Sequence, residues 1–540
     1  MKKYILFLLI FYSVVLFGED PVGNYYWVQF NTKANTPYSI SSPEYYLSQR
    51  AIERRQRQNI PIDSTDLPVN PEFIDSLISL GFYVKHTSRW MNGAIAILDT
   101  SIAIENILKP SFVSFYQLRK DIPLKSASTK FSDIDTMQIQ YYGNSYTQLA
   151  MVHGDQLQQF SKGKGVQIAI IDAGFSNSNQ LPVFDSIYQR NGVLGTYDFV
   201  NPGNDVYKEH YHGNAVFSIM AGNAPGSLIG SAPDASYWLL RSEDASTEYP
   251  VEEDYWIIAA EFADEKGCDV INTSLGYTTF DNPAFNHTYD QFDGKTLRIS
   301  KAANLAVEKG IVVVCSAGNS GNDSWGHVAA PSEAEDVLSV AAVDANGQVT
   351  AFSSRGFTGK WAIPKPDIAA MGAGVSYSSN TGAFVTGNGT SFSSPIIAGM
   401  AACLVSYYPE KTSFEIIDLI KTLGDLYPYC NAEYGYGIPN FSKVLNISNP
   451  DSIETVVNQI TNISSFVYPN PFTTKLYVEN NDDFSTLEIY SLQGTKLIVA
   501  QLESNNTEIS APKLSGLKKG VYFAVLKGEQ KIHSFKLIKQ

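Results

Sequence analysis

The sequence predicts an α/β fold for the long middle part of the chain, with a parallel central sheet and helices on both of its faces. Short runs of Val, Ile and Leu recur there, and segments with helical periodicity separate them. Strands that are buried on both faces read as such continuous apolar runs. The predicted strands are residues 166–171, 237–240, 270–274, 311–316 and 337–343, and predicted helices between them include 255–265 and 299–309.

Two smaller blocks flank this middle part. Before it, residues 25–30 and 92–98 have strand patterns and residues 44–56 have a helical one, which predicts a small α+β domain. After it, turn residues separate short alternating strands, which predicts a small all-β sandwich. The strands of this sandwich are expected at 475–478, 487–490 and 521–526.

At 540 residues the chain is too long for one compact domain. Polar segments with little apolar pattern mark the predicted boundaries. The predicted parts are a leader at 1–18, the N-terminal domain at 19–125, a linker with the start of the main region at 126–159, the main domain at 160–445, a second linker at 446–465 and the sandwich at 466–540.

The leader has the pattern of a secretory signal peptide. Lys2 and Lys3 precede an apolar run at 4–17, and Gly18 then precedes two acidic residues. An uncleaved anchor is the alternative interpretation. No later segment reaches about 18 uninterrupted apolar residues, so we expect no transmembrane anchor after cleavage.

Composition argues against a nucleic-acid-binding surface and against a metal site made of cysteines. A net charge of −15 without a basic stripe argues against a nucleic-acid surface. Cys268, Cys315 and Cys403 lie in apolar stretches, where a free cysteine behaves as a small hydrophobic residue. The cysteine spacings match no metal site. A disulfide between Cys403 and Cys430 stays an open alternative.

Two candidate catalytic residues follow or open apolar elements. Asp172 comes directly after the strand at 166–171, at the edge of a parallel sheet where sites form. An ordinary turn residue is the alternative. His212 opens an apolar helix, and Gly213 after it permits a close approach of the backbone. His210 competes with His212 for the same role.

A serine provides the third group. Ser391 follows two glycines and opens a helix that is almost entirely apolar and must therefore be buried. A serine in the first turn of such a helix has a fixed position near the positive end of the helix dipole. The alternative is that Thr390 or Ser391 is only an N-cap. Together with Asp172 and His212 it offers the groups of a nucleophilic triad.

Asn319 follows the strand at 311–316 and precedes Ser320-Gly321. Its amide is placed to donate to the oxyanion of an acyl transfer, and losing one such donor typically costs about 100- to 1000-fold in rate. A left-handed turn residue is the alternative.

The chain resembles subtilisin-like serine peptidases (subtilases) over roughly residues 160–440. The four signature stretches are AIIDAGF with Asp172, HGNAVFSIMAG with His212, VVCSAGNSG with Asn319 and GTSFSSPIIAGMAA with Ser391. They occur in the subtilisin order of Asp, His and Ser. Two departures exist: Ala173 stands where Ser or Thr is commoner, and Asn214-Ala215 replaces Thr/Ser-His. Neither removes a reacting group, so activity is expected.

The same resemblance implies the residues that bind substrate. The stretch DVINTSLG resembles the strand whose Ser-Leu-Gly segment pairs with the substrate backbone and lines the S1 pocket. Ser274, Leu275 and Gly276 match that segment, and Ala317 and Gly318 are expected to border the same pocket.

For the flanking blocks the resemblance implies maturation and export. The N-terminal domain would be a propeptide that acts as intramolecular chaperone and inhibitor, and its arginines would complement an acidic catalytic domain. They are Arg50, Arg54, Arg55 and Arg57. The C-terminal stretches YPNPF, LEIYSLQGTKL, GVYF and FKLIKQ resemble the sorting domain of type IX secretion cargo. A generic binding module is the alternative.

The sequence thus predicts a secreted or cell-surface serine endopeptidase that acts through an acyl-enzyme. Its expected partners are protein or peptide substrates, its own propeptide and the secretion machinery. A surface-displayed binding protein on an inactive subtilase scaffold, or a serine esterase, is the alternative. No cofactor is expected for the chemistry. Structural calcium is conceivable in the insert with Asp281, His287, Asp290 and Asp293, but no metal ligand is assigned.

Overall fold

The structure is a computed structural model, and it describes residues 20–121, 141–356, 365–447 and most of 466–539. The predicted signal peptide, residues 126–140 of the first predicted linker and most of the second predicted linker lie outside the described residues. The chain forms two compact units, residues 1–443 and 444–540, and each is described by itself.

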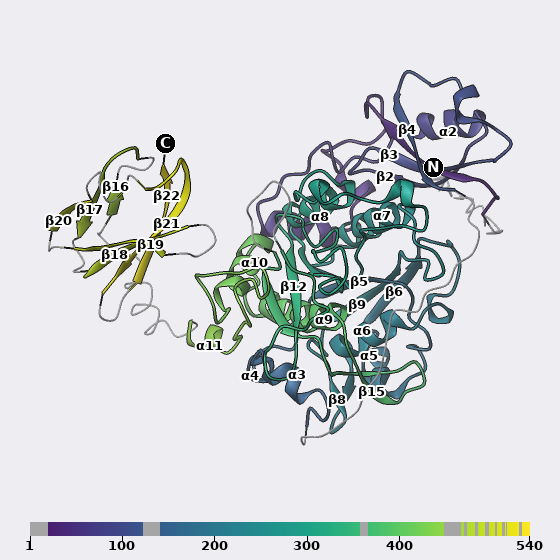
Figure 1. Cartoon of the computed structure of the whole chain (residues 1–540). Helices are drawn as coiled ribbons and strands as arrows, with labels where there is room; N and C mark the ends of the chain where they lie inside the picture. The colour runs from purple at the N-terminus through teal and green to yellow at the C-terminus, as the bar shows by residue number, and fades with distance from the viewer. Residues whose placement is uncertain are drawn as a thin grey trace, which may run out of the picture. The chain divides into compact units, whose positions relative to one another are not determined.

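A seven-stranded parallel sheet forms the centre of the first unit, as predicted (Figure 1). The strand order is β13-β12-β11-β10-β5-β9-β6. Two strands were not predicted: β6 is a half-exposed edge strand, and β13 has only four residues. The strands are β5 Gln167–Asp172, β6 Val193–Asp198, β9 Ser236–Arg241, β10 Val270–Thr273, β11 Val312–Ser316, β12 Leu338–Val343 and β13 Ile368–Met371.

Two pairs of helices cover the sheet. α6 (His212–Ala221) packs on α9 (Thr390–Tyr407), and α7 (Val251–Lys266) packs on α8 (Arg298–Glu308). In Figure 1, α7 and α8 lie between the sheet and the N-terminal block. Among the described residues, only α9 is long and apolar enough to cross a membrane, and 83% of its apolar window is buried inside the unit. It is the core helix that the sequence predicts.

The strand order explains where the site lies. β5 is central, with β9 and β6 on one side and β10 to β13 on the other. Successive crossovers therefore diverge at β5, and ligands of such sheets bind beyond the carboxyl ends of the strands at this switch point. Asp172 is the last residue of β5.

The N-terminal block is an antiparallel sheet with two helices, in agreement with the predicted α+β pattern. The predicted helix at 44–56 was placed too early: α1 is Gln49–Arg57, because Ser48 caps it by accepting a hydrogen bond from the Ala51 N–H at 3.2 Å. The strand order is β2-β3-β1-β4. The other elements are α2 Pro71–Ser79, β1 Asn24–Phe30, β2 Tyr83–Ser88, β3 Gly93–Leu98 and β4 Val113–Lys120.

The four arginines of α1 dock this block on the part of the first unit that contains the parallel sheet, which confirms the expected charge complementarity. Arg54 and Arg55 bind the buried Asp264 at the end of α7. Arg50 and Arg57 bind Asp269, which precedes β10.

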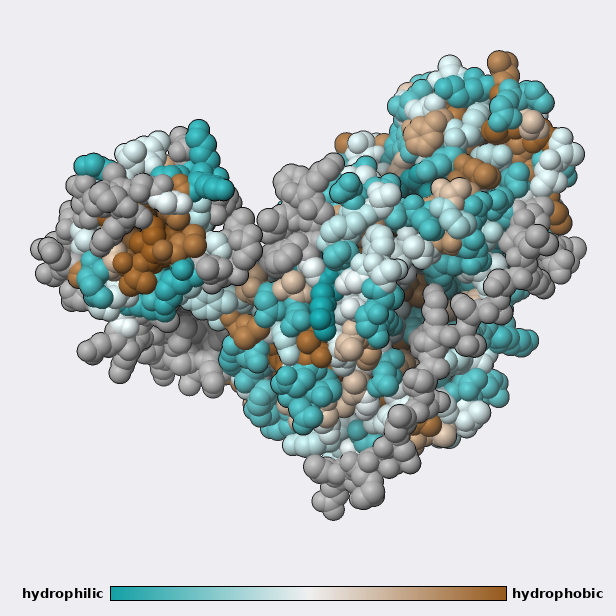
Figure 2. Space-filling view, in the orientation of Figure 1, coloured by the Kyte–Doolittle hydropathy of each residue, from teal (hydrophilic) through white to brown (hydrophobic). Residues whose placement is uncertain are grey.

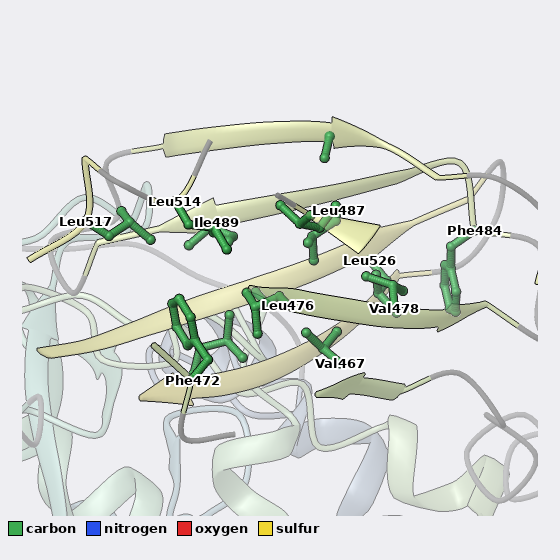
Figure 3. Close-up of a cluster of buried hydrophobic side chains, with 14 residues drawn as sticks. Val467, Phe472, Leu476, Val478, Phe484, Leu487, Ile489, Leu514, Leu517 and Leu526 are labelled. Carbon is green, nitrogen blue, oxygen red and sulfur yellow. The ribbon is translucent and has the colours of Figure 1, made fainter. Parts of the chain in front are cut away.

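The second unit contains two antiparallel sheets, β16-β17-β20 and β19-β18-β21-β22. Apolar side chains from both sheets and from the segments that connect their strands form one core (Figure 3). Figure 2 shows apolar surface on this unit, where Leu497, Val499 and Phe523 are each more than 40% exposed. The strands are β16 Phe466–Tyr468, β17 Leu476–Asn480, β18 Thr486–Tyr490, β19 Lys496–Gln501, β20 Asn505–Ile509, β21 Gly520–Lys527 and β22 Ile532–Lys539.

Candidate active site

A buried hydrogen bond joins Asp172 to His212. The His212 Nδ1 lies 2.8 Å from the Asp172 Oδ1, and the same oxygen accepts the backbone N–H of Ala173 at 2.7 Å. Asp172 is fully buried and His212 is 4% exposed. The carboxylate fixes the imidazole with Nδ1 engaged, which leaves Nε2 as the nitrogen for proton transfer. Ala173, one of the two sequence departures, still supplies its backbone N–H.

Gly213 makes this contact geometrically feasible. A Cβ at Gly213 would lie 2.4 Å from the carbonyl oxygen of Gly174 and 3.0 Å from the Asp172 Cβ. The predicted close approach at the start of α6 is therefore confirmed. His210 has a different role, since its Nδ1 accepts the backbone N–H of His212 at 3.3 Å. Burial, followed by the neighbouring His212, lowers the pKa of His210.

Ser391 is the second residue of α9 and is 6% exposed. The next residue, Phe392, stacks its ring against His212 with 6.1 Å between the centroids. Because α6 and α9 also pack together, the serine and the histidine open two neighbouring helices at one site. The Ser391 hydroxyl donates to the carbonyl oxygen of Ser274 at 3.1 Å.

Asn319 is exposed, and its side-chain amide has a fixed orientation. Its Oδ1 accepts two hydrogen bonds from Thr390, one from the backbone N–H at 2.9 Å and one from the hydroxyl at 3.0 Å. The Nδ2 on the other side of the amide is the group that can donate a hydrogen bond. A Cβ on Gly389 would lie 3.6 Å from this Nδ2, so glycine keeps the space beside it open.

The predicted substrate segments lie on either side of one alanine. Ser274, Leu275 and Gly276 follow β10, and Ala317 and Gly318 follow β11. A Cβ at Gly276 would lie 2.8 Å from the Ala329 Cβ, and one at Gly318 would lie 3.4 Å from it. The backbone of Ala329 also binds Ala317, with its N–H donating to that carbonyl at 3.0 Å. The structure thus brings both segments together around Ala329.

Sequence reasoning missed Arg241, which supports the Asp172 turn. It is the last residue of β9, is 4% exposed, and donates from Nε to the Ala173 carbonyl at 3.2 Å. Its Nη1 binds Asp198 at 2.9 Å. The signal was the one that marked Asp172: a charged residue directly after an apolar strand.

The acidic residues of the insert have structural partners. His287 Nε2 lies 2.7 Å from the Glu253 carboxylate, Asp281 accepts the Glu248 N–H, and Asp293 accepts the N–H and hydroxyl of Thr296. Asp290 lies in the first turn of a 3₁₀ helix.

Within the described ranges, one group of three carboxylates has oxygens close enough to share a metal ion: Glu243, Glu248 and Glu252. The oxygens of the buried Glu252 already accept the N–H groups of Asp244 and Tyr249. Burial raises the pKa of Glu252 well above its usual range.

The cysteines all lie in described residues and are free. Cys403 is buried and Cys430 is exposed, so the alternative of a bridge between them is wrong for this structure. The three buried thiols have pKa values raised by burial, which makes them inert packing groups.

Three family models match the chain. The model described as the subtilase family matches residues 163–437, the peptidase S8 propeptide domain of Bacteroidota matches 25–133, and the secretion system C-terminal sorting domain matches 466–540. Together they cover most of the chain, in the order predicted from the sequence.

Curated relatives point to the same family. Subtilisin DY of Bacillus licheniformis is 30% identical over 296 residues, which are 52% of this chain and 93% of that protein. Subtilisin E of Bacillus subtilis is 28% identical over 372 residues, which are 68% of this chain and 84% of that protein. Among solved structures, MycP1 with its N-terminal propeptide removed is 23% identical, with a TM-score of 0.46, and covers 56% of this chain and 98% of that one.

Proposed function

The chain belongs to the subtilase family and is a secreted serine endopeptidase, and we propose that Asp172, His212 and Ser391 are its catalytic triad. The observation that carries the proposal is the buried 2.8 Å contact between His212 Nδ1 and Asp172, beside the serine that opens α9. A binding scaffold has no need of this arrangement.

The reaction would begin with a reorientation of the Ser391 hydroxyl. Its proton points at the Ser274 carbonyl and must turn toward His212 before transfer. His212 would accept the proton at Nε2 while Ser391 Oγ attacks the peptide carbonyl. Asp172 would hold the ring and stabilise the imidazolium. His212 would then protonate the leaving amine, and water would hydrolyse the acyl-enzyme by the same proton path.

Asn319 Nδ2 and the backbone N–H of Ser391 would bind the oxyanion. The Ser391 N–H belongs to the first turn of α9, where N–H groups have no intrahelical acceptor. The Asn319 amide is held by Thr390 from the same turn, so both donors move with the nucleophile. Donors fixed in this way need no rearrangement when negative charge develops.

Ser274, Leu275 and Gly276 would bind the substrate backbone, and Ala317 and Gly318 would border the S1 pocket. The support is that residues 274–276, between β10 and the bridge from Tyr277 to Ala330, have no strand partner among the described residues, which leaves their edge for an extended peptide. The Ala329 methyl group between the two segments would limit the depth of the pocket.

The N-terminal block fits a propeptide, and we infer that it is a transient inhibitor. Its buried arginines bind α7 of the catalytic part, and its removal would be the step that frees the enzyme. The C-terminal unit directs export through the secretion machinery.

The proposed chemistry uses side chains and backbone N–H groups and requires no cofactor. Any calcium would have a structural role, and no ligand set is assigned to it.

The test is a variant that lacks only the nucleophile. Ser391→Ala is expected to lower peptide hydrolysis more than about 1000-fold with little change in the melting temperature of the protein, because it removes the nucleophile and only one side-chain oxygen atom. Turnover of a peptide substrate at the wild-type rate would contradict the assignment. Comparing peptide and ester substrates would separate a peptidase from an esterase.

A further inference from the structure

Asn272 is a polar residue in an otherwise apolar strand. It lies in β10 and is fully buried, and its neighbours in register are Ile170 of β5 and Val314 of β11. An amide costs free energy in such surroundings unless its groups are paired. The partners of Asn272 therefore show what the residue is for.

Both ends of the Asn272 amide are used. The Oδ1 accepts the Ser394 hydroxyl at 2.8 Å, and the Nδ2 donates to the Ser274 Oγ at 3.1 Å. Ser394 belongs to the first turns of α9, and Ser274 follows β10. The amide thus joins the end of β10 to the helix that carries the nucleophile.

The network continues from Ser274 to Ser391 in two directions. The Ser274 hydroxyl donates to the Ser391 carbonyl oxygen at 2.9 Å, and the Ser391 hydroxyl donates to the Ser274 carbonyl oxygen at 3.1 Å. The Asn272 Nδ2 can only donate. Because it occupies the acceptor side of the Ser274 hydroxyl, that hydroxyl must give its own proton to Ser391.

We propose that Asn272 is a positioning residue that acts through the Ser274 hydroxyl to hold the backbone of Ser391. The inference rests on the proposed role of Ser391 as nucleophile. A small displacement of a nucleophile costs much in rate, because attack requires near-contact geometry. Loss of the Asn272 donor should therefore lower kcat more than it raises KM.

Asn272→Asp is the informative substitution, because it keeps the shape and the acceptor for Ser394. A carboxylate cannot donate, so the Ser274 hydroxyl would turn to it and release the Ser391 carbonyl. A protonated carboxyl group can donate and would restore the native direction. The ratio of kcat in Asn272→Asp to kcat in the wild type should therefore rise as the pH falls.

The experiment is a double-mutant cycle in the matured enzyme with Asn272→Asp, Ser274→Ala and both together. We expect about a 10-fold loss of kcat from Asn272→Asp in the wild-type background, the value of one buried hydrogen bond. In the Ser274→Ala background the same change should alter kcat by less than about twofold, because the path to Ser391 is already cut. An equal loss in both backgrounds would overturn the proposal.

Asn304→Asp is the matched control. Asn304 is another buried amide with two partners, donating to the Gly294 carbonyl and accepting the Asp336 N–H, and these bonds do not lead to Ser391. It should lower the melting temperature and leave the kcat ratio independent of pH. A pH-dependent kcat ratio in this control would also overturn the proposal.

If Asn272→Asp fails to fold, Asn272→Ala replaces it in both backgrounds, since it adds no buried charge. Labelling of the wild type by a fluorophosphonate separates the two levels of inference. Labelling at Ser391 together with an additive cycle rejects only the role of Asn272. Labelling at another serine rejects the nucleophile itself.

Discussion

Two polar networks of the first unit differ in which part of the chain supplies their partners. Around the proposed triad, the described hydrogen-bond partners of Asp172, His212, Ser391 and Asn319 belong to the catalytic part. At the interface with the N-terminal block, the described cations that bind Asp264 all come from that block. The first network survives removal of the block and the second does not.

The cations at Asp264 are Arg54, Arg55 and Arg89. Burial alone would raise the pKa of Asp264, but these arginines hold it well below its usual range. The neighbouring Asp254 differs: Arg119 of the block binds it, and Arg298 of α8 binds it as well. The comparison shows an interface that is tight while the block is attached and that leaves an unpaired carboxylate afterwards.

The effect on catalytic rate that separates the two networks should come from the oxyanion donor. Asn319→Leu is expected to lower kcat about 100- to 1000-fold with little change in KM, because the amide acts on charge that develops in the transition state. Docking of the N-terminal block should be unaffected. Steady-state kinetics on a peptide substrate measure the first effect, and a change confined to KM would contradict the assigned role.

The converse change is Asp264→Asn, made in the full chain with Ser391→Ala to prevent processing. The substitution removes the negative charge that three arginines bind. Removing one partner of a buried ion pair lowers the free energy of unfolding by about 3–5 kcal/mol. Asp254→Asn should lower the free energy of unfolding by less, because Arg119 still has its ion pair with Glu253 and Arg298 is partly exposed. Denaturant unfolding of both variants measures the difference. Equal losses would show that the source of the cations does not matter.

A smaller effect concerns pH. His86 of the block lies against Tyr255, and its Nε2 donates to the Phe199 carbonyl at 2.8 Å. Burial, then Lys85, lowers the pKa of His86 to about 4, while the Phe199 carbonyl and Asp20 oppose the shift. His86 therefore favours docking at a pH above about 6.5, the ordinary pKa of histidine. As the pH falls from there toward 4, the equilibrium constant for docking should fall by up to about tenfold per pH unit.

Glu261 of α7 should give docking the opposite pH dependence. Burial raises its pKa to about 7, although Arg89 and the N–H groups of the block oppose the shift. Its contribution to docking is present at low pH and is lost as pH rises through 7. Between about pH 4.5 and 6.5 the two groups should compensate each other.

Single variants should separate the two pH dependences. The quantity measured is the melting temperature of each variant relative to the parent chain with Ser391→Ala, as a function of pH. The melting temperature of His86→Asn should rise relative to that of the parent as the pH falls. The melting temperature of Glu261→Gln should rise relative to that of the parent as the pH rises. His153→Asn is the control, since the ring of His153 pairs with the side chain of Gln156 within the catalytic part. Parallel pH curves for all three variants would rule out both assignments.

The ends of apolar runs made much of the candidate site predictable. Asp172, His212, Asn319 and Ser391 each follow or open such a run, and the parallel sheet brings those ends to one edge. Gly213 was predictable for the same reason, because a close approach requires a missing Cβ.

Other residues depend on contacts between distant segments. Asn272 lies in a recognised stretch, but its partner Ser394 is 122 residues away. Asp264 is one acidic residue among several on α7, and only the docked arginines distinguish it. Ala329 lies between Gly276 and Gly318, which follow two different strands, and no local sequence pattern predicts this contact.

The most direct test of the central claim is fluorophosphonate labelling of the secreted protein after removal of the N-terminal block, with the modified residue mapped. The account predicts one modified residue, Ser391, and loss of labelling on denaturation, because only the assembled triad activates the hydroxyl. Absence of labelling in folded protein, or modification of a different serine, would contradict it.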